Sequence, residues 1–298
     1  MEIVGYEAGL ADDVVSLYNR AVSGLPHCYP VDADRLDAAI GRVHQAAESG
    51  DSEDGAAFVA LADGRAVGFV DVGVAQPREW GEGRQGVICF LYYLSGQRAA
   101  GQALLDAAER HIAEQDVPLI QAFPQEWRYP FYDLHAAYLS DRLGHIEGLL
   151  GMNGYERVRG EVMLDWPDFR PVVPGPPDSS ADVDVSLPEG RGRLPGVRVR
   201  AEIEGTYVGQ CACVSGGEYA PDQDAQEWVE VVDLRVTRDQ QGHGWGRHLL
   251  LRALHEAREA GYRHAAISCH WHNDRALLFY SNYGFRVVDM TYGWGREL

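Results

Sequence analysis

The sequence contains no lysine: all 26 basic residues among its 298 are arginine. This absence excludes several mechanisms. A Walker A loop needs a lysine on the nucleotide phosphates, a protein kinase needs its strand lysine, and a pyridoxal phosphate enzyme needs a Schiff-base lysine. None of these three classes can operate with this sequence.

Long apolar stretches and paired cysteines are also missing. No stretch is long enough to span a membrane and the first residues do not resemble a signal peptide, so we expect a cytoplasmic protein with no membrane partner. The five cysteines form no C-x-x-C pair, which favours reduced, buried thiols. His270 and His272 are spaced like a metal pair, but no cysteine or carboxylate set near them completes a site. We therefore expect no bound metal.

Positive charge is scarce as well. The formal net charge is −19 at pH 7, whereas proteins that bind nucleic acids or anionic membranes need a basic surface. The balance argues against a nucleic-acid partner and favours a neutral or cationic substrate. Its simpler interpretation is that excess charge keeps the protein soluble.

A linker divides the chain into two predicted domains. Residues 170–196 hold six of the fourteen prolines, a composition typical of linkers. We therefore predict a first domain at residues 1–169 and a second domain at residues 197–298.

The two halves repeat one pattern. Gly64-x-x-Val67-Gly68 recurs as Gly205-x-x-Val208-Gly209 at an offset of 141, and Arg98-x-x-Gly101-x-Ala103 recurs as Gln241-x-x-Gly244-x-Gly246 at an offset of 143. In both halves an apolar strand pattern follows the first motif and a helical pattern follows the second. Landmarks that agree this closely indicate an internal repeat.

The second half is predicted to be the shorter one. Before its hairpin, the first half has a predicted strand at residues 1–6 and predicted helices at 11–25 and 32–47, whereas the second half has only the linker. We therefore expect the second domain to have lost its opening strand and helices, so that something else must cover that face of its sheet.

Three glycines, Gly242, Gly244 and Gly246, lie within five residues between a strand pattern and a helical pattern. Such a loop lets the backbone approach a ligand closely, and the first amides of the helix attract an anion. A dinucleotide-binding loop is the weaker alternative, because it needs glycine where Arg247 stands. A glycine-rich turn with no ligand is the third interpretation.

A second motif sharpens the interpretation of the glycine loop. Residues 241–246, QGHGWG, fit the signature Q/R-x-x-G-x-G/A, and the later stretch NDRALLFYSNYGF supplies Asn273, Tyr280, Gly284 and Phe285. With both motifs in this order, the sequence resembles the GNAT superfamily of acyl-CoA-dependent N-acetyltransferases in its tandem form. The resemblance implies an α/β fold of two domains, each a mixed, mostly antiparallel twisted sheet flanked by helices, the second domain being shortened.

The resemblance also implies an activity: transfer of an acetyl group from acetyl-CoA to a primary amine of a small molecule, in the second domain. Tyr280 would be the general acid that protonates the departing thiolate, although it could instead be a core aromatic. Asn273 would contact the cofactor, although it could merely cap the helix that follows. The other implied cofactor contacts are Leu234, Arg235, Val236, Gln241, Gly242, His243, Gly244, Trp245, Gly246 and Arg247.

The general base is predicted from strand periodicity. An alternation of two places Glu230 on one face of the strand, with Leu234 and Val236, and Asp233 on the other. Glu230 is the first candidate if its face meets the substrate, and Glu227 and Asp233 follow.

The first domain departs from the pattern. It has Ala99 and Ala100 where the second has Gly242 and His243, and Leu150 where the second has its tyrosine. We therefore expect a degenerate first domain. Two other functions stay open for the whole chain: a regulatory module that binds acyl-CoA without turnover, and an assembly scaffold with no cofactor.

Overall fold

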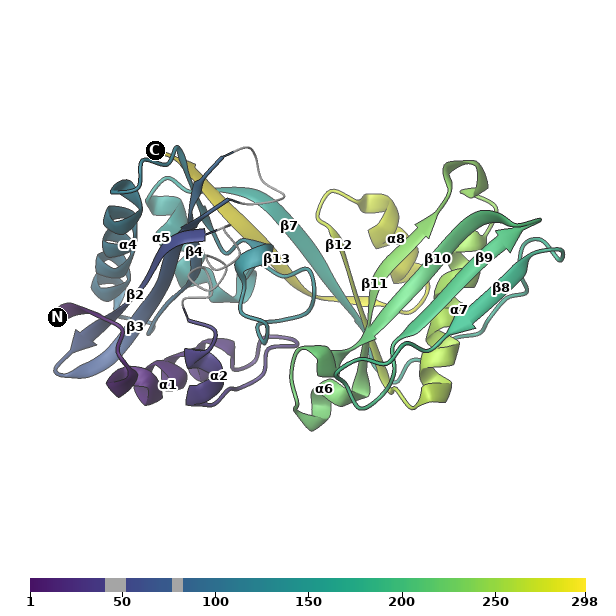
Figure 1. The fold of residues 1–298 in the computed structure, drawn as a ribbon, viewed down its shortest axis with the longest axis horizontal. Coiled ribbons are helices and arrows are strands. Elements are labelled where there is room, and N and C mark those ends of the chain that lie inside the picture. The colour runs from purple at the N-terminus through teal and green to yellow at the C-terminus, as the bar shows by residue number, and fades with distance from the viewer. Residues whose placement is uncertain (41–51, 77–82) are drawn as a thin grey trace. The chain divides into compact units, whose positions relative to one another are not determined.

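The computed structural model describes residues 1–40, 52–76 and 83–298 (Figure 1). It divides into two compact units, of which the first comprises Met1–Glu161 and Asp289–Leu298 and the second comprises Val162–Val288. This division differs from the predicted domains, because the last ten residues belong to the first unit. Among the described residues, no helix is both long and apolar enough to cross a membrane.

The first unit is built on a mixed sheet in the order β1-β2-β3-β4-β5-β13. The pairings from β1 to β4 are antiparallel, β4 and β5 are parallel, and β5 and β13 are antiparallel. The strands of this part of the chain are β1 (Glu2–Gly5), β2 (Ser52–Ala62), β3 (Arg65–Ala75), β4 (Gln85–Tyr93), β5 (Leu119–Ala122), β6 (Leu139–Ser140) and β7 (Glu156–Trp166), and the last strand of the chain is β13 (Arg286–Glu297).

Helices cover both faces of this sheet. The helices are α1 (Ala11–Val22), α2 (Ala33–Asp37), α4 (Arg98–Ala113) and α5 (Gly144–Met152). The Tyr18 ring of α1 packs on Phe90, which stacks on Phe69. On the opposite face, Gly68 lies under Leu104 of α4. The predicted helix at 11–25 is confirmed by α1. The start of the helix predicted at 32–47 corresponds to α2. Residues 41–47 of that prediction lie outside the described part of the chain.

The C-terminal strand completes the sheet of the first unit. Trp294 pairs with Ala122, and Glu297 pairs with Leu119. Asp289 is the first residue of the segment 289–298, and its carboxylate accepts a hydrogen bond of 2.7 Å from the Ser140 hydroxyl. These pairings are the physical reason that residues 289–298 group with the first unit, although they follow the second domain in sequence.

The second unit has a mixed sheet in which β8, β9, β10, β11 and β12 are neighbours in that order. Only the β11–β12 pairing among these is parallel. The strands are β8 (Asp182–Ser186), β9 (Val197–Ile203), β10 (Thr206–Ser215), β11 (Trp228–Val236) and β12 (His264–His270), and the helices are α6 (Gln223–Glu227), α7 (Trp245–Ala260) and α8 (Asp274–Asn282).

The predicted linker contains a strand. The alternating sequence DVDVS forms β8, which pairs antiparallel with β9 from Asp182↔Glu202 to Ser186↔Arg198. The expectation that the second half lacks an opening strand was therefore wrong. The linker composition hid this strand because prolines surround it on both sides.

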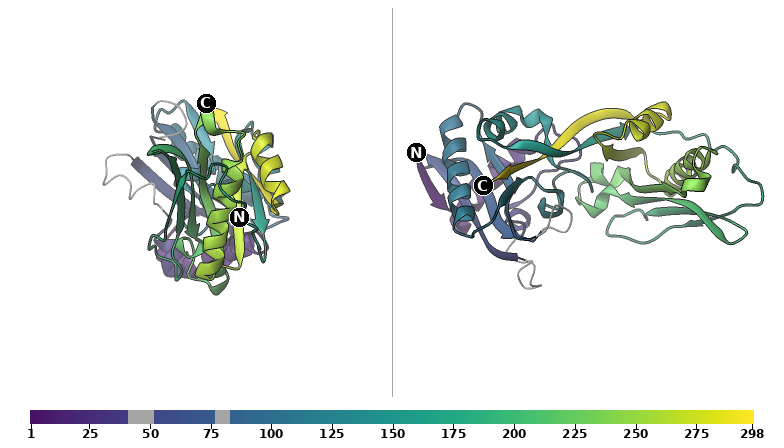
Figure 2. Two further views of the ribbon diagram at one scale, coloured as in Figure 1. Left: turned by 90° about the vertical axis from the view of Figure 1, so that its right-hand side faces the viewer. Right: turned by 90° about the horizontal axis from the view of Figure 1, so that it is seen from above.

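One face of the second sheet packs against α7 (Figures 1 and 2). The buried residues Val199 and Cys211 pair across the strands on this face, and Leu249 of α7 lies next to Gly209. The side chains of Arg198 and Arg200 point the other way and are exposed. Within the second unit, polar side chains rather than a helix therefore occupy the face that the sequence expects to be covered.

The two sheets share the same irregularity. Each hairpin turns on a pair of residues with positive φ, Asp63-Gly64 in the first unit and Glu204-Gly205 in the second, as the twist of two-residue turns requires. The central strand of each unit then carries a β-bulge, at Cys89 in β4 and at Val232 in β11. The bulges are 143 residues apart, which is also the offset of the glycine motifs.

We predict that removing residues 289–298 destabilises the first unit more than the second. The deletion leaves the edge of β5 without its antiparallel partner. Amides of Leu119–Ala122 should then lose protection in hydrogen-exchange mass spectrometry, while those of Val229–Val231 serve as an internal control and keep theirs. Equal losses in both segments would contradict the assignment of β13 to the first unit.

Candidate functional site

Two central strands of the second unit separate part-way along their length. β11 and β12 pair in parallel from Trp228↔His264 to Val231↔Ile267, and no pairing follows although both strands continue. Residues 232–236 of β11 therefore present an unpaired backbone edge on that side. Such an edge can bind an extended ligand through main-chain hydrogen bonds, in the manner of an added strand.

The bulge at Val232 changes which side chains share a face. Val231 pairs with Cys213 and Leu234 pairs with Cys211, so these two residues of β11 lie on the α7 side. Glu230 pairs with Val214 and Asp233 with Ala212, which places both acids on the opposite face. The predicted alternation, which put Glu230 with Leu234 and apart from Asp233, was wrong because one extra residue inverts the pattern.

Glu230 is a buried carboxylate with a tyrosine partner. Its exposed fraction is 2%, and the Tyr219 hydroxyl donates a hydrogen bond of 2.6 Å to its Oε2. Tyr219 belongs to the connection between β10 and β11. No sequence pattern predicts this contact, because the stretch GGEYAPDQDAQEW is typical of a polar loop.

Asp233 and Arg235 form an exposed ion pair further along β11. The Arg235 Nε lies 2.8 Å from Oδ1 of Asp233, and Gln210 of β10 also donates to this carboxylate. The hydrogen bond and charge of Asp233 raise the pKa of the Arg235 guanidinium. Asp233 is thus already engaged, which favours Glu230 over Asp233 as the candidate base.

The glycine loop joins the end of β11 to α7. Gly242 and Gly244 have φ of +83° and +96°, which side chains rarely tolerate. Gly244 caps α7, and within the described part of the chain the amides of residues 242–247 donate no hydrogen bond. These orphan amides at a helix N-terminus are the donor set that a pyrophosphate would use.

Side chains around the loop fix its position. The side-chain amide of Gln241 donates a hydrogen bond of 3.1 Å from its nitrogen to the Val236 carbonyl. Its oxygen accepts a hydrogen bond from Arg275 of α8. Trp245 is buried with 1% exposure, so only its backbone can reach a ligand. His243 and Arg247 are exposed beside the loop, and the Arg247 guanidinium lies 5.4 Å from the centre of the Tyr283 ring.

The second sequence motif forms α8. Asn273 is its N-cap, where Oδ1 accepts a hydrogen bond of 3.1 Å from the Ala276 amide. The capping interpretation of Asn273 is thus confirmed, and its cofactor contact stays a prediction. Tyr280 is 9% exposed and its ring packs near Phe279 and Phe285. Phe279 also lies beside Gly246, which brings α8 next to the start of α7.

The corresponding loop of the first unit is closed. α4 begins at Arg98, the counterpart of Gln241, and the amides of Ala100 and Gly101 both donate to the Gln97 carbonyl. The Tyr93 ring packs on Gly101. Its hydroxyl donates to the His145 carbonyl at 2.9 Å, and His145 Nε2 lies 3.0 Å from the Tyr93 carbonyl oxygen. Two of the amides that would receive an anion are therefore already used.

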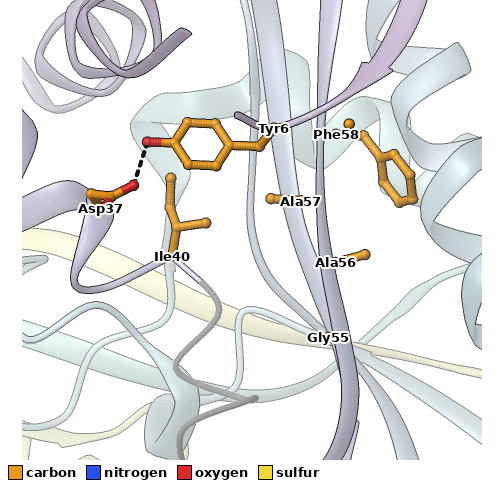
Figure 3. A pocket seen from close by; sticks show the side chains of 8 residues that line it. Tyr6, Asp37, Ile40, Gly55, Ala56, Ala57 and Phe58 are labelled. Carbon is orange, nitrogen blue, oxygen red and sulfur yellow. Dashed lines mark hydrogen bonds between the residues drawn. The ribbon is translucent and has the colours of Figure 1, made fainter. Parts of the chain in front are cut away.

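Other features of the described residues are weaker candidates. A cavity of about 410 Å³ in the first unit is lined by Tyr6, Asp37 and Phe58 among others, but Tyr6 donates its hydroxyl proton to Asp37 at 2.8 Å, so these polar groups are paired (Figure 3). No three metal-ligating side chains of the described residues lie close enough to hold an ion. None of the cysteines is in a disulfide.

We predict that Asn273→Ala lowers the free energy of unfolding by about 1 kcal/mol, because α8 loses its N-cap. Asn273→Ser should restore most of that stability, since serine also caps helices. Urea denaturation measures this effect. Titration with acetyl-CoA then separates the two roles: a serine variant that is stable but binds more weakly supports a cofactor contact, and one that binds normally leaves only the cap.

The model of the acetyltransferase (GNAT) family matches residues 161–285. A tandem GNAT protein from the clavulanic acid biosynthesis pathway is 15% identical, with a TM-score of 0.63 over 99% of this chain and 98% of that chain. A GCN5-related N-acetyltransferase from Sphaerobacter thermophilus is 16% identical, with a TM-score of 0.64 over 99% and 95%.

A third solved structure matches at 14% identity with a TM-score of 0.67. It is a GCN5-related glucosamine N-acetyltransferase region in a fungal multi-domain GH3 β-N-acetylglucosaminidase, and the match covers 99% of this chain and 38% of that chain. No curated protein matches the sequence.

These matches confirm the predicted fold class, with two tandem domains of mixed sheet and flanking helices. The family model also spans the segment that holds the separated strands, the glycine loop and α8. Residues 161–285 therefore match the model of the acetyltransferase (GNAT) family, and the whole chain has the fold of the solved tandem GNAT protein.

Proposed function

We propose that the protein transfers the acetyl group of acetyl-CoA to the primary amine of a small molecule, and that the second unit performs the chemistry. The observation that carries the proposal is the set of orphan amides at residues 242–247, next to the unpaired edge of β11. The match of residues 161–285 to the GNAT family model supports acyl transfer from acyl-CoA.

The residues of the loop and strand fit such a co-substrate. Amides 242–247 would hold the pyrophosphate, aided by the partial positive charge at the start of α7. The backbone of Leu234, Arg235 and Val236 would pair with the pantetheine chain. Arg235, Arg238 and Arg247 are exposed along this stretch, which makes it locally basic in a strongly acidic chain.

Acyl transfer needs a neutral amine, a donor for the oxyanion and a proton for the leaving sulfur. Glu230 would take one proton from the ammonium acceptor, so that the nitrogen lone pair can attack the thioester carbon. Val232 has no cross-strand partner on β10 or β12, which makes its amide our candidate oxyanion donor. Tyr280 would give its proton to the sulfur as the C–S bond breaks and the C–N bond forms, and the second proton lost by the nitrogen would return to the Tyr280 oxygen.

A non-catalytic module that senses acyl-CoA is the alternative, since the loop would serve it equally well. The buried carboxylate at Glu230 favours the enzyme. Acyl-CoA binding through the loop needs no acid on β11, whereas deprotonation of an amine needs a base.

We predict that the protein binds one acetyl-CoA per chain in a calorimetric titration. Gly244→Glu should weaken binding by about 100-fold, because it strains the loop and places a negative charge beside the phosphate site. Gly205→Glu is the matched control, since Gly205 also has a positive φ and lies in an exposed turn of the same unit. A second equivalent of bound acetyl-CoA would show that the first unit also binds it. No binding to the unmodified protein would contradict the proposal.

We predict that Tyr280→Phe and Glu230→Gln each lower the rate of acetyl transfer by about 100-fold or more, the usual contribution of general acid–base groups. Both variants should bind acetyl-CoA as the unmodified protein does. Release of the CoA thiol in the presence of a panel of primary amines measures the rate. Normal binding with no turnover by the unmodified protein across the panel would favour the sensing module.

A further inference from the structure

The Glu230 carboxylate depends on a donor that lies outside its own strand. A carboxylate that is 2% exposed loses its hydration and must regain it from protein donors. The Tyr219 hydroxyl supplies a hydrogen bond of 2.6 Å, a length typical of a hydroxyl that donates to an ionised oxygen. The contact therefore favours the ionised form of Glu230, which is the form that can accept a proton.

The connection that carries Tyr219 is fixed on both sides of it. Ser215, at the end of β10, accepts a hydrogen bond from the Gly217 amide at 3.1 Å. Glu218 accepts from both the amide and the guanidinium of Arg191, at 2.6 and 3.0 Å. Gln226 donates to the Ala220 carbonyl at 3.0 Å. The residues on either side of Tyr219 are thus tied to the framework of the second unit.

Gln226 also ties the connection to the segment before β9. Its Oε1 accepts a hydrogen bond of 2.8 Å from the Arg193 amide, and its side chain is 6% exposed. Gly217 lies against this side chain with no room for a Cβ. These contacts hold the backbone on both sides of Tyr219 beside Glu230.

The first unit lacks this arrangement. The bulges at Cys89 and Val232 correspond, so the counterpart of Glu230 is Val87, a residue with no exposed surface. The unit with the closed glycine loop therefore also lacks the carboxylate. The acid and the open loop occur together in the second unit.

We propose that Tyr219 is a positioning residue that holds the Glu230 carboxylate ionised and oriented toward the amine acceptor. The inference rests on the proposed function, because it gives Tyr219 a role in deprotonating the acceptor. It extends that function to the connection between β10 and β11, which would then set the lower pH limit of the reaction.

The test is a titration of Glu230 by NMR, which needs no acceptor. Glutamate is labelled with ¹³C at its carboxyl carbon, and the Glu230 signal is identified by its loss in Glu230→Gln. In Tyr219→Phe the ionised form loses the hydrogen bond from the Tyr219 hydroxyl, so the midpoint of the titration should rise by about one pH unit. Activity that requires ionised Glu230 would then fail at a higher pH.

Tyr155→Phe is the matched control. Tyr155 is a buried tyrosine of the first unit whose hydroxyl donates a hydrogen bond of 3.1 Å to the Glu109 carboxylate, so this variant loses the same kind of contact away from Glu230. The Glu230 midpoint should not change in this variant. An unchanged midpoint in Tyr219→Phe, or an equal rise in Tyr155→Phe, overturns the inference.

A second variant covers the case in which Tyr219→Phe does not fold. 3-Fluorotyrosine at position 219 keeps the ring and hydroxyl but is a stronger donor, so the Glu230 midpoint should fall; an unchanged midpoint again overturns the inference. Titration with acetyl-CoA distinguishes a failure of the role of Tyr219 from a failure of the proposed function. Normal acetyl-CoA binding with an unchanged midpoint defeats the role of Tyr219 alone, whereas absent binding by the unmodified protein defeats the proposed function.

Discussion

The site depends on a single extra residue in β11. The bulge at Val232 interrupts the pairing with β10, which resumes at Asp233, and it lies just where the pairing with β12 stops. A strand with regular pairing on both sides would have no edge to offer, and its carboxylates would alternate between the two faces. Because the bulge intervenes, β11 gains an open edge and carries Glu230 and Asp233 on the face opposite α7. The glycine loop then begins five residues beyond the bulged strand, at Gln241.

The two units show how one scaffold can be opened or closed with few changes. Both contain the hairpin turn, the bulge and a helix after the central strand, at corresponding positions. In the first unit, alanines in place of Gly242 and His243 let α4 begin four residues earlier than α7, and its first amides turn inward to Gln97. Tyr93 and His145 then join the end of β4 to α5. Helix propensity in a four-residue stretch therefore separates an anion-binding loop from an ordinary helix start.

The sequence predicted the features that depend on local chemistry. Glycine spacing located the loop, apolar spacing located α1, α4 and α7, and Asn273 was recognised as a potential cap. The face of Glu230 could not be predicted, because no composition signal marks an inserted residue within a strand. The strand β8 was hidden between prolines, and Tyr219 meets Glu230 only through the fold of its loop. Each of these features depends on contacts between residues far apart in the sequence, and periodicity does not report such contacts.

The place of β13 has a consequence for the order of folding during synthesis. Residues 294–297 pair with β5 in the first sheet, yet more than 160 residues separate them from Ala122 in the chain. The first unit cannot complete its sheet while the ribosome is still making the second. Until then the edge of β5 is an open strand, the kind of surface that pairs with the wrong partner. Synthesis of the second unit therefore takes place beside an incomplete neighbour, and one late strand closes the first sheet.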